Sequence, residues 1–108
     1  MMEAFKEMYD VVVNRRSEPQ EGSYTCYLFE KGLDKILKKC GEECTEMVIA
    51  AKNRDKDELA NEINDLLYHM VVLMVECGVS VEDIEKIMVE RSAKIGNLKQ
   101  FHVSDHNT

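Results

Sequence analysis

The chain has 108 residues, which is enough for one domain. Its 21 acidic and 14 basic residues give a formal net charge of -7, which argues against a nucleic-acid-binding protein that works through a basic surface. No apolar run approaches the roughly 18 residues of a membrane span, and the N-terminal segment lacks the apolar core of a signal peptide. We therefore expect a cytoplasmic domain with neither a nucleic-acid nor a membrane partner.

The chain contains four cysteines, Cys26, Cys40, Cys44 and Cys77, and none of them forms a C-x-x-C pair. In the cytoplasm such thiols stay reduced. Cys40 and Cys44 are four residues apart, a spacing that could bind a metal on a helix. Both fall within an apolar stripe, however, so we expect them in the core, where free cysteine behaves as a small hydrophobe.

The first two helices are predicted on either side of a loop. Apolar residues between Phe5 and Val12 follow the i, i+3, i+4, i+7 pattern of a short amphipathic helix. The segment 17–22, which holds the single proline, indicates a loop. A second helical segment then begins, with Ser23 or Thr25 as its N-cap.

Three further helices are expected after this segment. A long helix spans about 33–52, and a second long helix begins at the N-cap Asp55 and stops at Gly78, a favoured C-cap residue. Ser80, with an acidic residue three positions later, opens a last helix that runs to about Ala93. The prediction is an all-α domain over residues 1–96, followed by a polar C-terminal tail over 97–108.

Each of the two long helices carries a pair of carboxylates three residues apart. At about 100° of rotation per residue, Glu43 and Glu46 lie at the edge of one apolar face, and Glu62 and Asp65 lie at the edge of the next. If the two faces pack together across the turn at 53–54, the four carboxylates meet along one seam. Like charges in such a seam repel unless a cation neutralises them, and Mg²⁺ or Mn²⁺ prefers oxygen ligands. The pattern therefore indicates a divalent metal site.

The plain alternative is that these carboxylates are solvated surface groups, because charged helix faces usually are. The repetition of the pair beside a second apolar stripe favours the metal site, and periodicity carries the prediction no further. The apolar face of the first long helix comprises Leu33, Ile36, Leu37, Cys40, Cys44, Met47, Val48 and Ala51, and that of the second comprises Leu59, Ile63, Leu66, Leu67, Met70, Leu73 and Met74.

The residues themselves resemble a known superfamily. The E-E-x-x-E of residues 42–46, followed by the E-x-x-D of residues 62–65, resembles the signature of the MazG-like all-α nucleotide pyrophosphatases. One position departs from the pattern, since Asn64 stands where a small residue such as alanine is usual. Further elements resemble the phosphoribosyl-ATP pyrophosphatase family of histidine biosynthesis, namely Ser23-Tyr24-Thr25, Lys31-Gly32, Lys35-Ile36, Lys38-Lys39, Gly41-Glu42-Glu43, Ala50-Ala51-Lys52, Asp65-Leu66 and Tyr68-His69.

The resemblance implies a bundle of four to five helices that is completed by dimerisation into a homodimer or a larger homo-oligomer. It also implies hydrolysis of phosphoribosyl-ATP to phosphoribosyl-AMP and diphosphate with Mg²⁺, or with Mn²⁺ as a substitute. Carried over residue by residue, Glu43, Glu46, Glu62 and Asp65 would be the metal ligands. Glu42 would join Glu43 and Glu46 as a catalytic residue that completes the metal's ligand shell or orients the attacking water.

Basic residues would complete the site. Lys31, Lys35, Lys39 and Lys52 are candidate phosphate contacts, because an acidic cluster alone would repel a triphosphate. His69, one turn beyond the second carboxylate pair, would contact substrate or hydrogen-bond a ligand carboxylate. The alternatives are that the lysines are solvated surface residues without a role in binding and that the histidine is structural.

Two other functions stay open at this point. One is a MazG-like enzyme that removes aberrant or deoxynucleoside triphosphates, and the other is a non-enzymatic helical dimerisation module with solvated carboxylates. The lysine-rich run and Tyr68-His69 favour phosphoribosyl-ATP over other nucleotides.

Overall fold

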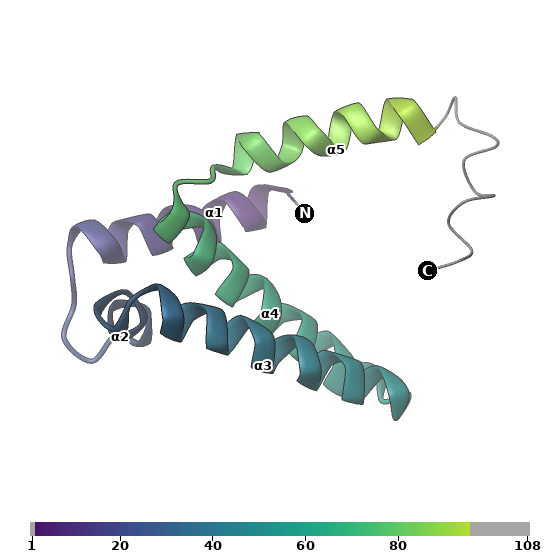
Figure 1. Cartoon of the computed structure of the whole chain (residues 1–108), viewed down its shortest axis with the longest axis horizontal. Coiled ribbons are helices and arrows are strands. Elements are labelled where there is room, and N and C mark those ends of the chain that lie inside the picture. The colour runs from purple at the N-terminus through teal and green to yellow at the C-terminus, as the bar shows by residue number, and fades with distance from the viewer. Residues whose placement is uncertain (1, 96–108) are drawn as a thin grey trace.

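The computed structural model describes residues 2–95, which form five helices (Figure 1). No strand occurs in this part of the chain, so the all-α prediction is confirmed. Within the same residues, no helix is long and apolar enough to cross a membrane. The predicted tail lies outside the described residues. In chain order the helices are α1 (Met2–Ser17), α2 (Tyr24–Lys31), α3 (Leu33–Lys52), α4 (Lys56–Cys77) and α5 (Val81–Ile95).

Side-chain caps begin α2 and α4 where the sequence predicts them. The Ser23 side chain accepts a hydrogen bond from the Cys26 backbone N–H at 3.2 Å, which makes Ser23 rather than Thr25 the N-cap of α2. Asp55 caps α4 in the same way by accepting from the Glu58 N–H at 3.1 Å. Each cap satisfies a backbone donor that the first turn of a helix leaves free.

The connection from α4 to α5 is also set by its residues. Gly78 ends α4 in the left-handed conformation, with φ of 76°, which only glycine adopts readily. Ser80 and Asp83 then form a reciprocal box, in which the Asp83 N–H donates to the Ser80 hydroxyl at 3.0 Å and the Ser80 N–H donates to the Asp83 carboxylate at 2.9 Å.

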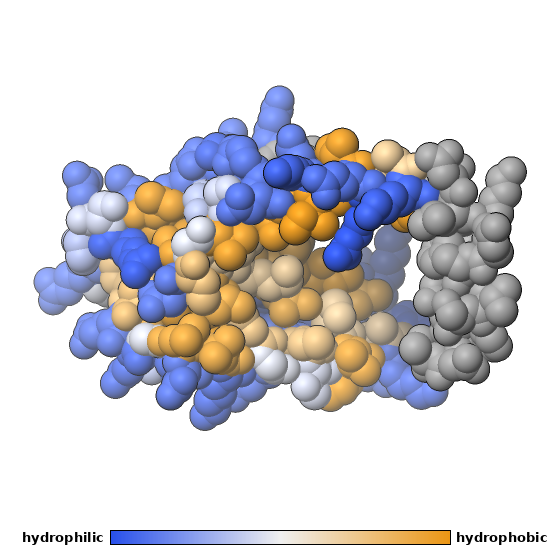
Figure 2. All heavy atoms as spheres, turned by 45° about the horizontal axis from the view of Figure 1, so that its top comes forward, coloured by the Kyte–Doolittle hydropathy of each residue, from blue (hydrophilic) through white to orange (hydrophobic). Residues whose placement is uncertain are grey.

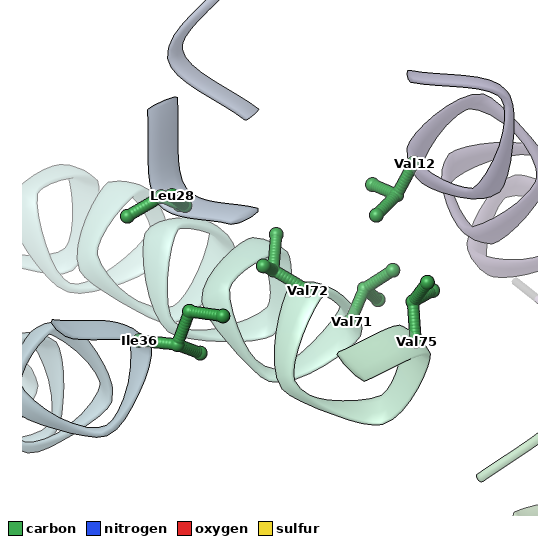
Figure 3. Packing of buried hydrophobic residues seen from close by; sticks show 6 residues of the cluster. All are labelled: Val12, Leu28, Ile36, Val71, Val72 and Val75. Carbon is green, nitrogen blue, oxygen red and sulfur yellow. The ribbon is translucent and has the colours of Figure 1, made fainter. Parts of the chain in front are cut away.

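The hairpin of α3 and α4 is the centre of the fold. α4 also packs on α1 and α2, and α2 fills the corner between α1 and α3 (Figure 1). Figure 3 shows the core side chains of these four helices converging on α4. The buried cluster comprises Val12, Leu28, Ile36, Val71, Val72 and Val75.

α4 covers only one flank of the apolar face predicted for α3. The residues of α3 that the structure buries wholly or partly on this flank are Ile36, Cys40, Glu43, Met47 and Ala50. Leu37 and Val48, on the other flank, are 47% and 57% exposed, and Cys44 is exposed as well. The prediction that Cys44 lies in the core is therefore wrong for the single chain, because the apolar stripe is wider than one partner helix can cover.

α5 stands apart from the hairpin, and among the five described helices it packs only on α1 (Figure 1). Its Ile87 and Met88 are exposed, as are Ile63 and Met70 of α4. Figure 2 shows hydrophobic residues on both sides of the space between α5 and the α3–α4 hairpin. Among residues 2–95, a single copy of the chain thus has a broad apolar surface that is exposed.

Candidate active site

The seam between α3 and α4 brings three carboxylates together. Glu43, Glu62 and Asp65 each offer one oxygen, and the three oxygens lie within 4.8 Å of one another. The periodicity predicts Glu43 at the edge of the apolar face. The residue is instead only 7% exposed and lies inside the seam. Glu46, one turn further along α3, is exposed and close enough to raise the pKa of both Glu43 and Glu62.

Two of these carboxylates hold an oxygen that is buried and unpaired. Oε2 of Glu43 and Oε2 of Glu62 have no hydrogen-bond partner among the described residues. Burial raises the pKa of both groups above the ordinary value of 4.5, and the neighbouring carboxylates raise it further. A buried acceptor without a partner is costly, and a divalent cation would relieve both the missing contacts and the repulsion. The donor set fits Mg²⁺.

The cluster is open to solvent at its border. A hollow of about 290 Å³ lies beside Glu46 and Glu62, where the last turn of α3 faces the first turns of α4. Water and a phosphate group can therefore reach the carboxylates from this side. The other lining residues are Ile49, Ala50, Asn53, Asp55 and Glu58.

Glu42 does not join the carboxylate cluster. Its Oε1 lies 3.3 Å from the Lys39 Nζ, while the same ammonium group lies 3.8 Å from Oε1 of Glu43. Lys39 is thus the cation that directly borders the cluster, and Glu42 is bound to it on the exposed side.

The remaining predicted lysines occupy two separate places. Lys31 and Lys35 both lie over the Tyr27 ring, with their Nζ atoms 5.8 and 5.9 Å from its centroid. Lys52 is exposed at the far end of α3, 17 residues or about 25 Å along the helix axis from Lys35. Lys52 of one chain therefore cannot contact the same phosphate as the other two.

Comparison with known proteins decides the family. The sequence profile described as phosphoribosyl-ATP pyrophosphohydrolase matches residues 5–92. The chain belongs to the phosphoribosyl-ATP pyrophosphohydrolase family. The predicted enzyme class, a hydrolase, is thereby confirmed over a non-enzymatic helical module.

Several relatives of this family are closely similar along most of the chain. The phosphoribosyl-ATP pyrophosphatase of Streptococcus sanguinis is 54% identical over 99 residues, which cover 92% of this chain and 95% of the relative. That of Streptococcus gordonii is 61% identical over 87 residues, or 81% and 84% of the two chains. A bifunctional histidine biosynthesis protein of Thermoanaerobacter pseudethanolicus is 66% identical over 79 residues, which cover 73% of this chain and 37% of that longer protein.

In this member of the phosphoribosyl-ATP pyrophosphohydrolase family, His69 is a buried residue with both ring nitrogens engaged. It is 5% exposed, and Nδ1 lies 2.7 Å from the backbone carbonyl of Asp65. A carbonyl accepts only, so Nδ1 carries the proton and Nε2 accepts from the Tyr24 hydroxyl at 2.9 Å. These bonds leave neither nitrogen for substrate and neither of them goes to a ligand carboxylate, so they favour the alternative of a structural histidine.

The contact between Tyr24 and His69 joins two segments that the sequence reasoning treats separately. The hydroxyls of Thr25 and Tyr68 are also hydrogen-bonded to each other, beside the first pair. Tyr24 therefore ties α2 to the turn of α4 that carries Asp65. Spacing along the chain does not predict this pairing, because the partners are more than 40 positions apart.

Proposed function

We propose that this enzyme hydrolyses the α–β anhydride bond of phosphoribosyl-ATP in histidine biosynthesis and releases phosphoribosyl-AMP and diphosphate with Mg²⁺. One observation carries the proposal: in a chain of this family, Glu43 and Glu62 lie in one carboxylate cluster, and each has a buried oxygen without a partner among the described residues. Relatives that match over most of their length bear the name phosphoribosyl-ATP pyrophosphatase.

Glu43, Glu62 and Asp65 would hold the metal, with Glu46 at its solvent side. Bound Mg²⁺ lowers the pKa of its water and offsets charge on the phosphoryl oxygens. Glu46 lines the open hollow and can accept the proton of the attacking water there. Lys39 lies beside Glu43, one turn before it on α3, and can pair with a phosphoryl oxygen in place of Glu42.

The competing substrate class is an aberrant or deoxynucleoside triphosphate. We expect turnover of phosphoribosyl-ATP to exceed that of a panel of such nucleotides at equal Mg²⁺, measured as diphosphate release. Faster hydrolysis of a deoxynucleotide would overturn the substrate assignment.

The metal assignment has its own test. Asp65→Ala and Glu46→Ala should each lower kcat by about 100-fold or more, since Asp65 would hold the metal and Glu46 would take the proton of the attacking water. Asn64→Ala is the matched control, because Asn64 is exposed on α4 beside Asp65. Circular dichroism should show an intact fold in all three, and wild-type rates in the first two would contradict the assignment.

The proposed functional unit is a cytoplasmic homodimer. The support for the dimer is the apolar surface that one chain leaves uncovered on α3, α4 and α5. A second copy is the natural cover, because a two-fold contact lets the same surface serve both chains. The cytoplasmic location stays a prediction.

A further inference from the structure

A continuous row of aromatic and cationic groups leads away from the carboxylate cluster. It starts at Lys39, which lies 3.8 Å from Glu43. The next group is the Tyr24 ring, close enough to Lys39 and Glu43 for both charges to act on its pKa. Tyr24 stacks on Tyr27 with ring centroids 6.1 Å apart.

The row ends in a pair of cations. Lys31 and Lys35 share the ring of Tyr27, which is 40% exposed, although they belong to different helices. Gly32 makes this possible, because its φ of 89° and ψ of -172° bend the chain sharply between α2 and α3. Two ammonium groups fixed beside one exposed aromatic face suit a ligand that presents both a phosphate and a ring.

The substrate of the proposed function has two anionic ends. Phosphoribosyl-ATP is ATP whose adenine carries a second ribose with a phosphate of its own. The triphosphate belongs at the carboxylates and Lys39, so the second phosphate must lie on the far side of the adenine.

We propose that Tyr27, Lys31 and Lys35 form the subsite for this second phosphate and its ribose. The inference rests on the proposed function and states how the enzyme distinguishes phosphoribosyl-ATP from ATP. Tyr24 and Tyr27 lie between the two anionic ends, and their exposed ring atoms can contact the adenine.

The spacing agrees with this assignment. Lys35 precedes Glu43 by eight residues, or about 12 Å along α3, which leaves room for the adenine between a phosphate at Lys35 and the phosphates at the metal. A hollow of about 580 Å³ also borders Tyr24 and Tyr27. Its lining includes Gln20, Ser23 and Glu30, which can hydrogen-bond ribose hydroxyls.

The test compares the affinities of phosphoribosyl-AMP and AMP, which differ only in the phosphoribosyl group. Titration calorimetry of the full chain with Mg²⁺ gives the affinity ratio without turnover. We expect wild type to favour phosphoribosyl-AMP by at least about tenfold, as two charge-assisted contacts allow. The double variant Lys31→Ala/Lys35→Ala should bind AMP as wild type does but should lose most of the preference for phosphoribosyl-AMP. For phosphoribosyl-ATP, its KM should rise with kcat nearly unchanged.

Two controls sharpen the comparison. Lys38→Ala removes an exposed lysine of α3 that does not lie over Tyr27, and it should leave the ratio unchanged. Tyr27→Phe keeps the ring and should preserve the ratio, whereas Tyr27→Ala should lower it.

Equal affinities of wild type for the two nucleotides would overturn the subsite. So would an unchanged ratio in the double variant, or an equal loss of affinity for both nucleotides, which would place the lysines on the phosphate that both share. Failure of wild type to hydrolyse phosphoribosyl-ATP would instead refute the proposed function itself.

Discussion

At the scale of single residues, the carboxylates at the α3–α4 seam oppose the folding of the metal-free protein. Burial and neighbouring carboxylates raise the pKa of Glu43 and Glu62 above 4.5. An unfolded glutamate ionises at a lower pH than these folded ones. In their protonated form these two groups therefore favour the folded state. This stabilisation is complete below the unfolded pKa and is lost as pH rises through the folded pKa.

Glu62→Gln should remove part of this loss. In a chelator, the free energy of unfolding of wild type should fall relative to that of the variant as pH rises above the ordinary glutamate value of 4.5. Urea denaturation at several pH values measures the difference. At neutral pH, Mg²⁺ at 100 times its Kd should stabilise wild type by about 2.7 kcal/mol and the variant by much less. Parallel pH curves for the two proteins would contradict the shifted pKa values.

The hydroxyl of Tyr24 offers a second residue-level prediction. Tyr24→Phe leaves Nε2 of buried His69 without its donor, which should cost about 1–3 kcal/mol of unfolding free energy. The affinity for Mg²⁺ should also fall, because His69 bonds to the backbone of Asp65.

Tyr27→Phe is the matched control for this change. Tyr27 belongs to the same helix, and its hydroxyl makes no hydrogen bond to the described residues. Urea denaturation and Mg²⁺ titration of both variants test the prediction. Equal effects of the two substitutions would show that the bond to His69 has no special role.

At the scale of helices, the sequence predicts boundaries better than contacts. Local chemistry decides where α3 and α4 begin and end, and it is readable at Asp55 and Gly78. Periodicity does not decide which flank of α3 meets α4, because the apolar stripe is wider than one helix covers. Glu43 is therefore found inside the seam and Cys44 outside the core. The carboxylate cluster is predictable because its members lie on adjacent helices.

Gly32 and Gly41 give opposite predictions for the same substitution. At Gly32, the Cβ of an alanine would meet no atom within 4 Å, but its φ of 89° is one that other residues rarely adopt. Gly32→Ala should therefore lower the free energy of unfolding by about 1–3 kcal/mol. Gly41 lies within α3 with equal space around it, and Gly41→Ala should stabilise the protein by about 0.5–1 kcal/mol.

Thermal or urea unfolding of the two glycine variants compares them directly. Gly32→Ala should also weaken binding of phosphoribosyl-AMP, because the bend at Gly32 brings Lys31 and Lys35 to one ring. Stabilisation by both substitutions would show that the α2–α3 bend carries no backbone strain.

At the scale of the whole molecule, we expect the uncovered apolar surface to determine the assembly. Packing within residues 2–95 buries one flank of α3, and α5 contacts none of the other described helices except α1. The exposed flank includes Leu37 and Val48, and apolar residues of α4 and α5 extend it (Figure 2). Burial of this surface against a second copy would add hydrophobic stabilisation of about 25 cal/mol per Å².

A charge in this surface should therefore dissociate the dimer. Val48→Lys should raise the dimer Kd by about 100-fold or more, because the interface would have to desolvate an unpaired ammonium group. Val11→Lys is the matched control, since Val11 on α1 is 52% exposed, close to the 57% of Val48, but lies outside α3, α4 and α5. Sedimentation equilibrium gives the mass of each protein. A wild-type monomer at all concentrations, or equal dissociation by both substitutions, would refute a dimer built on this face.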